Sequence, residues 1–294
     1  MKIERKRPIK SGLTNVSMQR LFWAVILFAL PASGFSGEAQ VPGAPDKEPP
    51  PKGESAVKSG GPESAPVPLM EQRALDRLKR MSETLGAAKT FTVRSRSTVE
   101  VPAKTGQYVT LLGTSEVALE RPNKLRVKVT GEVPNFEFYY EGTNMAAFAR
   151  QNNVYSMDRA PGTIDELLNV VENKSGIHFA LEDVMFSDPY AMLTKDLTSA
   201  FVVGPATVDG APCEHLAFKG RGVHWEIWVD TQSALPRHLV VTYAEAQNLP
   251  RFLVEFSDWN LQPRLAADFF VFKPPPNAKQ IEFRPMAPSP TGRK

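Results

Sequence analysis

The chain lacks the residues and the long apolar runs that disulfide, zinc or membrane-spanning structures require. Among its 294 residues there is one cysteine, Cys213, so an internal disulfide and a cysteine-based zinc site are both excluded. No apolar run reaches the roughly 18 to 20 residues that a transmembrane helix needs. We therefore expect a globular domain that is stabilised by burial of apolar side chains, which make up 42% of the residues.

Motifs of the common enzyme classes are also missing. The sequence contains no glycine-rich phosphate loop, no Gly-x-Ser-x-Gly elbow and no His-Glu-x-x-His pair. Glu182 and Asp183 are adjacent, but neighbouring side chains diverge on any regular element, so they indicate a solvated helix start better than acid/base machinery. We therefore predict a protein that is not an enzyme and that needs no cofactor.

Two pairs of potential metal ligands lie on predicted strands. Cys213 and His215 are two residues apart, so their side chains share a face and could both touch a metal. No second Cys-x-His or His-x-x-x-His supplies the missing ligands, and ordinary packing is the better interpretation. His224 and Glu226 repeat the spacing on the next strand, where they indicate a solvated face. No metal is expected.

The positive charge of the chain is concentrated at its N-terminus. The formal net charge is +3, but residues 1–37 hold six basic side chains and one acidic one, so the remainder has a net charge of −2. Two predicted strand faces carry alternating basic residues: Arg94 with Arg96, and Lys124 with Arg126 and Lys128. Acidic residues elsewhere balance them, so a wet sheet face explains both patterns and no nucleic-acid partner is expected.

The N-terminal residues have the order of a secretory signal. A basic stretch is followed by ten apolar residues, Leu21–Leu30, and then by small residues. Two cleavage sites of the small-x-small type follow: Ala32-x-Gly34 and Gly37-x-Ala39. An uncleaved anchor is the alternative, although ten residues are short for one. We predict a signal peptide at residues 1–37 and a mature protein outside the cytoplasm.

A proline-rich spacer precedes the folded part of the chain. Residues 38–68 carry eight prolines among Gly, Ser, Lys and Glu, and such a segment buries too little apolar surface to offset its ordering entropy. The last residues of the chain have a similar composition. We predict a disordered linker at 38–68, one folded domain at 69–283 and a disordered tail at 284–294.

The folded part opens with one helix and continues with many strands. Leu75, Leu78, Met81 and Leu85 recur at helical spacing, and Gly86 marks the end of the helix. Alternating segments follow at 90–101, 108–119, 125–129, 136–140, 145–149, 154–157, 201–208, 214–218, 223–229, 237–243, 252–256 and 269–272. So many short strands without alternating helices predict an α+β fold with one large antiparallel sheet of about eleven strands.

Two short helices interrupt these strands. Thr163 and Glu166 have the spacing of a capping box, and Asp188 and Pro189 predict the cap and first residue of a second helix. Behind the capping box an apolar stripe follows helical spacing: Ile164, Leu167, Leu168 and Val171. A sheet of this length tends to curl, so helices on its concave side are expected to act as a plug or lid.

Large apolar side chains recur on the predicted strands. The candidates for lining the interior are Phe136, Phe138, Tyr140, Trp225, Phe252 and Phe256, and Trp228, Phe269, Phe270 and Phe272 add to the apolar supply. They can fill a core. Two short helices are a small plug for such a sheet, so a leftover apolar cavity of the kind that a lipid carrier needs is the other interpretation. The residues leave both open.

Two short motifs resemble those of a known superfamily. Residues 120–127 (Glu-Arg-Pro-Asn-Lys-Leu-Arg-Val) and 268–276 (Asp-Phe-Phe-Val-Phe-Lys-Pro-Pro-Pro) are similar to marks of the periplasmic lipoprotein carriers LolA and LolB and their relatives. There, a strand ending in Arg-Pro-Asn turns into the next, and the last strand ends in Phe-x-Phe-x-Pro-Pro. Tyr140-Glu141-Gly142 resembles the hairpin that follows. Together with residues 160–165, the pattern most resembles an uncharacterised family of predicted periplasmic proteins in that superfamily.

The resemblance implies a half-open antiparallel barrel, lined with apolar side chains and lidded by helices, that binds acyl chains in the periplasm. It also implies that Arg121, in the Arg-Pro-Asn turn, bonds to the lid and holds it closed. The expected function is a non-enzymatic carrier or binding protein for an acyl chain, a lipid or a lipid-modified protein. The alternative is an envelope sensor or interaction protein that has a filled core and binds a protein partner through the same sheet.

Overall fold

The computed structural model describes residues 69–132, 135–160, 162–175, 182–220 and 222–282 of the chain. The predicted signal peptide, the linker and the C-terminal tail therefore lie outside the described residues. The first part contains α2 (Gln72–Ala87), β1 (Thr90–Pro102), β2 (Tyr108–Glu120), β3 (Lys124–Gly131), β4 (Phe136–Tyr140), β5 (Asn144–Ala149), a 3-10 turn (Arg150–Asn152) and β6 (Val154–Arg159). The second part contains α3 (Ile164–Ser175), α4 (Glu182–Met185), α5 (Pro189–Thr194), β7 (Leu197–Val208), β8 (Ala211–Gly220), β9 (Val223–Asp230), β10 (Pro236–Tyr243), β11 (Arg251–Asn260) and β12 (Lys279–Gln280).

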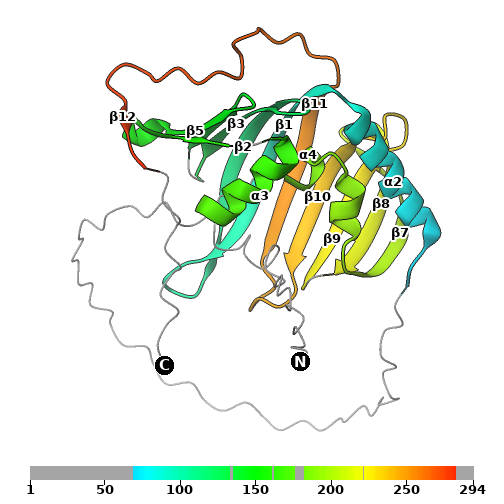
Figure 1. The fold of residues 1–294 in the computed structure, drawn as a ribbon. Helices are drawn as coiled ribbons and strands as arrows, with labels where there is room; N and C mark the ends of the chain where they lie inside the picture. The colour runs from blue at the N-terminus through cyan, green and yellow to red at the C-terminus, as the bar shows by residue number, and fades with distance from the viewer. Residues whose placement is uncertain (1–68, 133–134, 161, 176–181, 221, 283–294) are drawn as a thin grey trace, which may run out of the picture. The chain divides into compact units, whose positions relative to one another are not determined.

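All of the described strands belong to one open sheet of 12 strands, in the order β12-β6-β5-β4-β3-β2-β1-β11-β10-β9-β8-β7 (Figure 1). Every pairing is antiparallel except the one between β12 and β6. The pairing of β1 with β11 joins the first run of strands to the last. The predicted α+β class with a large, half-open antiparallel sheet is thereby confirmed.

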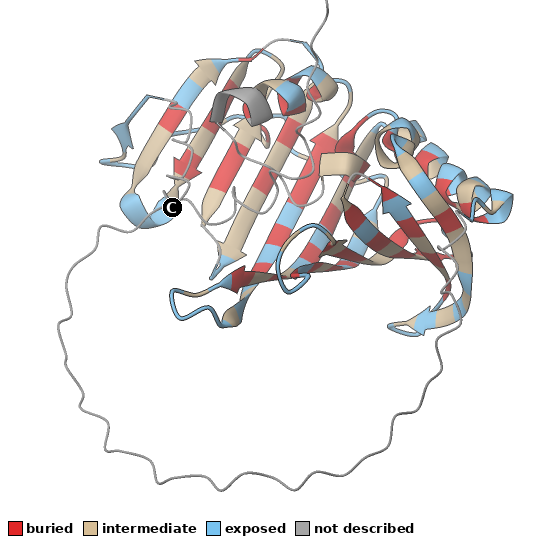
Figure 2. Ribbon diagram, turned by 90° about the horizontal axis from the view of Figure 1, so that it is seen from below, coloured by how far each residue is buried: buried red, intermediate tan, exposed pale blue. Residues whose placement is uncertain are grey.

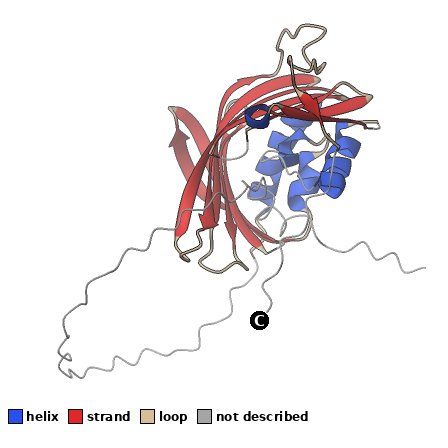
Figure 3. Ribbon diagram, turned by 90° about the vertical axis from the view of Figure 1, so that its left-hand side faces the viewer, coloured by secondary structure: helices blue, strands red, loops and turns tan. Residues whose placement is uncertain are grey.

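The strand registers place the apolar side chains of neighbouring strands on one face. Val117 of β2 lies opposite Val93 of β1 and Val127 of β3, and Val127 lies opposite Phe138 of β4. Because side chains alternate along a strand, buried and less buried residues alternate as well, as Figure 2 shows. The sheet curves, and the helices lie against its concave face (Figure 3).

Helix α2 packs on the concave face through the stripe that its sequence predicts. Leu78, Met81 and Leu85 are fully buried. Arg73 and Arg77 of α2 both donate hydrogen bonds to the buried carboxylate of Glu214 in β8, and the bond from Arg77 is 2.5 Å long. Paired guanidinium donors satisfy an acid that would be costly to bury alone.

The caps of the mid-chain helices also follow the sequence. The Thr163 amide donates to the Glu166 carboxylate at 2.8 Å, and the Glu166 amide donates to the Thr163 hydroxyl at 3.3 Å, which is the reciprocal pattern of a capping box. At α5 the Ala191 amide donates to Asp188 at 3.0 Å, and Pro189 stands at the start of the helix. Both predicted helix starts are confirmed.

Both edges of the sheet carry an additional segment of chain. At β7, the Ala200 amide donates to the Leu69 carbonyl and the Glu71 amide donates to the Ala200 carbonyl, both at 2.7 Å. At β6, the Lys279 amide donates to the Asn153 carbonyl at 3.0 Å, and the Ile281 amide donates to Tyr155 at 2.8 Å. The residues that enter the domain thus pair with the edge strand β7, and those that leave it form β12, which is itself the other edge of the sheet.

The predicted last strand at 269–272 is wrong. Residues 269–270 lie in a turn and 271–272 are irregular, and Phe272 packs on the outer face of the sheet against Tyr139, Phe148 and Tyr155, at ring-centroid distances of 5.3, 6.0 and 5.4 Å. The prolines that follow at 274–276 have no amide to donate to a ladder, and the aromatic rings gain contacts on the outer face instead. Pairing with β6 begins only at Lys279.

Candidate functional site

The concave face changes character along each of the strands β2–β5. At one end, beside the turn that joins β2 to β3, four inward side chains are fully buried: Leu119, Leu125, Tyr140 and Met145. We call this the covered end. At the other end, the inward side chains are only partly buried: Leu111, Val129, Phe136 and Ala149. We call this the open end, where Val109 is 36% exposed.

The covered end is closed by α3 and α4. The predicted stripe of α3, consisting of Ile164, Leu167, Leu168 and Val171, is buried in the same core cluster as the covered-end residues. The Ile164 amide donates to the Pro122 carbonyl at 2.8 Å, and the Tyr140 hydroxyl donates to the Gly162 carbonyl at 2.7 Å. Helix α3 is therefore fixed at its start to the β2–β3 turn and to β4.

Arg121 lies between this turn and α4. Its Nη1 and Nη2 atoms donate to the carbonyls of Met185 and Phe186, each at 3.0 Å, while its buried Nε has no hydrogen-bond partner among the described residues. Burial lowers the pKa of Arg121, and the charge of Asp165 opposes this shift. Asp165 of α3 also accepts hydrogen bonds from the Ser187 amide, at 2.9 Å, and from its hydroxyl. The arrangement joins both helices to the sheet through one turn.

The residues predicted to line the interior do not all occupy equivalent positions. Phe138, Tyr140, Trp225, Phe252 and Phe256 are buried on the concave face, with exposures of at most 6%. Phe136 alone of the six lies at the open end and is partly buried. Trp225 stacks on Phe218 at 4.1 Å between ring centroids. Five of the six candidates are thus core residues, and the sixth is partly buried beside them at the open end.

Two hollows are defined by described residues. A small cavity of about 20 Å³, near the end of α5, is lined by Met192, Leu193, Leu197 and Trp225 among others. A groove of about 500 Å³ includes Thr98, Leu112, His238, Leu253 and Glu255. The register places the side chains of these last five residues on the outer face of the sheet. The small cavity near α5 has room for about one water molecule.

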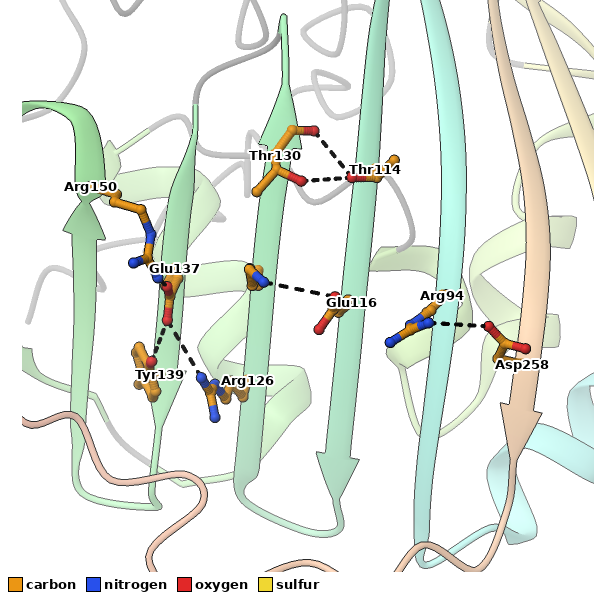
Figure 4. Close-up of polar contacts among 10 residues, drawn as sticks. Arg94, Thr114, Glu116, Arg126, Thr130, Glu137, Tyr139, Arg150 and Asp258 are labelled. Carbon is orange, nitrogen blue, oxygen red and sulfur yellow. Dashed lines mark hydrogen bonds and ion pairs between the residues drawn. The ribbon is translucent and has the colours of Figure 1, made fainter.

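The outer face carries polar networks among the side chains of neighbouring strands (Figure 4). Glu137 is buried there and accepts hydrogen bonds from Tyr139 and Arg150, with Arg126 at 3.5 Å. Arg126 lies over the rings of Tyr139 and Phe269, at 4.8 and 4.7 Å. Four residues of the basic strand faces noted in the sequence have an acidic partner within the sheet: Arg94, Lys124, Arg126 and Lys128.

The metal candidates take part in packing. The buried Cys213 thiol has a raised pKa because of burial and the nearby Asp230. His215 stacks on Trp228 at 3.9 Å and its Nε2 lies 2.9 Å from a Glu226 oxygen. Within the described ranges, no group of three or more His, Cys, Asp or Glu residues could hold a metal. Because Trp228 lies opposite His215 and stacks on it, its side chain is on the outer face and does not contribute to the concave face.

One feature of the concave face was missed from the sequence. Ser95 and Ser97 of β1 lie opposite Ser115 and Gly113 of β2, and Ser115 lies opposite Val129 of the open end. We call the first four of these residues the serine floor. Ser95 and Ser97 occupy the same alternate positions of β1 as Val93 and Val99. This alternation was the signal that could have placed them on the apolar face.

The fold and the concave site define a class of protein: an α+β half-barrel whose concave, apolar face is covered at one end by helices. The chain belongs to the family described as predicted periplasmic protein (DUF2092), whose model matches residues 74–284. This confirms the family recognised from the motifs and the periplasmic location expected from the N-terminal sequence. No helix in the described part of the chain is long and apolar enough to cross a membrane.

Comparison with known proteins gives distant similarities. No curated protein matches the chain. Among solved structures, the chain is similar to an uncharacterized conserved protein from Thermus thermophilus, with 10% identity over 72% of this chain and 98% of that chain and a TM-score of 0.40. It is also similar to a LolA superfamily protein from Nitrosomonas europaea, with 12% identity over 68% and 97% of the chains and a TM-score of 0.34. A third is lipoprotein LppX of Mycobacterium tuberculosis, with 12% identity over 66% and 98% and a TM-score of 0.36.

Proposed function

We propose that the protein is a non-enzymatic periplasmic binding or carrier protein for an acyl chain, carried by a lipid or a lipid-modified protein. The observation that carries this proposal is the open end of the concave face. There Leu111, Val129, Phe136 and Ala149 remain only partly buried. An acyl chain laid on these side chains would remove apolar surface from water, at roughly 25 cal/mol per Å².

The proposal gives α3 and α4 the role of a lid and Arg121 the role of its latch. Two hydrogen bonds from one guanidinium hold the carbonyls of Met185 and Phe186 at the end of α4. Charge-assisted bonds of this kind contribute about 1.5 to 3 kcal/mol. Loss of the latch would therefore change the ratio of open to closed protein by about tenfold to a hundredfold.

The first experiment asks whether the protein carries lipid. The full chain is expressed with export to the periplasm, purified without detergent, extracted with organic solvent and examined by mass spectrometry. A copurifying acyl lipid in stoichiometric amount is expected. Protein that is free of lipid and also fails to bind a fluorescent fatty acid would overturn the proposal.

The second experiment tests the latch. Off-rates of a fluorescent fatty acid are compared for the wild type, Arg121→Leu and the control Arg94→Leu. Arg94 is exposed on the outer face and has only a long ion pair of 3.7 Å to Asp258, so its loss should leave the rate unchanged. Arg121→Leu should exchange the probe about 10 to 100 times faster with an unaltered circular dichroism spectrum. Equal off-rates in all three proteins would remove Arg121 from the mechanism.

A second candidate function is an envelope sensor that binds a protein partner through the same sheet. The observation that favours it is the packing of Phe138, Tyr140, Trp225, Phe252 and Phe256, which are all buried in the core cluster. Photocrosslinking in cells from a residue of the open end separates the two functions. A carrier would trap lipid-modified clients of several sizes, whereas a sensor would trap one fixed partner.

A further inference from the structure

The serine floor interrupts an apolar surface. On β1, Ser95 and Ser97 stand between Val93 and Val99, which are both buried in the core cluster. On β2, Gly113 and Ser115 stand between Leu111 of the open end and Val117. Ser95 also lies opposite Phe256 of β11. Four small residues therefore adjoin the open end, because Ser115 lies opposite Val129 and Val129 lies opposite Phe136.

Ser95 carries a polar atom that this surface does not satisfy. The residue is 3% exposed, and its Oγ has no hydrogen-bond partner among the described residues. Native proteins satisfy nearly all buried hydroxyls, with protein groups, ordered water or a bound ligand. The hydroxyl therefore marks a place where an acceptor is missing from the protein itself.

The surroundings of Ser95 select the chemistry of that acceptor. Its neighbours on the concave face are Val93, Ser97, Ser115 and Phe256, none of which is charged. A carboxylate or phosphate buried here would have no counter-charge and would be strongly disfavoured. The carbonyl oxygen of an ester or amide is neutral and accepts one hydrogen bond at little desolvation cost.

We propose that the Ser95 hydroxyl donates a hydrogen bond to the carbonyl oxygen of an ester- or amide-linked acyl chain lying on the concave face. This inference rests on the proposed function and adds the class of ligand to it. The acyl chain extends over the open end from a carbonyl held at the serine floor. Linked acyl chains are bound in preference to hydrocarbon chains that lack the carbonyl.

The experiment uses two ligands that differ only in this carbonyl. 1-Monomyristoylglycerol has an ester at the head of its chain, and 1-O-tetradecylglycerol has an ether there. Dissociation constants for both are measured by competition with a fluorescent fatty acid. The proteins are the wild type, Ser95→Ala and Ser82→Ala. Ser82 of α2 is a matched control because its hydroxyl is also buried and without a partner among the described residues.

The wild type should bind the ester about 2 to 12 times more tightly than the ether, which is the value of one hydrogen bond. Ser95→Ala should bind both ligands equally, and Ser82→Ala should keep the preference. The Ser95→Ala protein should fold normally, because the substitution removes a hydroxyl that the described protein groups do not satisfy.

Equal binding of ester and ether by the wild type would overturn the inference, and so would an ester preference that survives in Ser95→Ala. In both cases ligands still bind, and the proposed function stands. If neither ligand displaces the fluorescent probe and the probe itself does not bind, the proposed function fails as well.

Discussion

The two ends of the same strands β2–β5 differ in burial although their sequences alternate in the same way. At the covered end Leu119, Leu125 and Tyr140 are fully buried, and at the open end Leu111, Val129 and Phe136 are not. The difference comes from what lies over them, since α3 and α4 are fixed to the β2–β3 turn at one end (Figure 1). An alternating pattern therefore identifies the apolar face of a strand but not how much of that face the fold fills.

The largest expected effect separates the ends by stability. Phe138→Ala removes a fully buried ring and should lower the free energy of unfolding by about 3 to 5 kcal/mol, because it leaves a cavity. Phe136→Ala, two residues away at the open end, should cost about 1 to 2 kcal/mol because less contact is lost. Urea unfolding of both variants measures the difference. Equal losses would mean that the open end is packed as tightly as the covered end.

Adding volume tests the same comparison in the opposite direction. Ala74 of α2 is fully buried, so Ala74→Leu should destabilise the protein by about 1 to 3 kcal/mol through overpacking. Ala149 is partly buried at the open end, opposite Phe136, and Ala149→Leu should change stability by less than about 0.5 kcal/mol. Thermal denaturation checks both. A large loss of stability in Ala149→Leu would mean that the open end is packed as tightly as the covered end.

A smaller change loosens the covered end. Tyr140→Phe keeps the ring but removes the hydroxyl that donates to the Gly162 carbonyl at 2.7 Å before α3. We expect a loss of about 0.5 to 1.5 kcal/mol. Hydrogen exchange should rise at the amides of α3 and not in β9 or β10. Uniform changes throughout the domain would show that this bond does not act on α3.

The smallest effect is expected on the outer face. The side chains of Arg94 and Asp258 are 64% and 67% exposed, and their ion pair is long, at 3.7 Å. Arg94→Ala should therefore change the free energy of unfolding by about 0.5 kcal/mol or less, and salt should reduce even this. A loss comparable to that of Phe136→Ala, measured by urea unfolding, would contradict the view that the concave face dominates stability.

Much of the fold could be predicted because the signals are local. The capping box of Thr163 and Glu166, the Asp188 cap and the two-residue alternation each depend on neighbours in the sequence. The segment at 269–272 alternates like a strand but packs on the outer face, since its position depends on Tyr139 and Tyr155, more than 100 residues earlier. Alternation alone could not distinguish these two outcomes.

The site was less predictable than the fold. The position of Arg121 was expected only from the resemblance, because its carbonyl partners Met185 and Phe186 lie 64 and 65 residues away. Side-chain size identifies all six aromatic candidates. Size alone does not tell whether a ring is fully buried, like Phe138, or partly buried, like Phe136. Ser95 was overlooked because a serine in an alternating strand carries no signal until the register shows which residues surround it.

The additional segments at the two edges of the sheet have a consequence for aggregation. An open edge strand is a template for pairing with another molecule. Here Leu69 and Glu71 bond to Ala200 of β7, and Lys279 and Ile281 bond to the segment around β6. Pro205 further interrupts β7, because it has no amide to offer a new strand. A chain shortened to end before Lys279 should expose β6 and associate edge to edge. Residues 279–281 are therefore expected to limit association between copies of the protein.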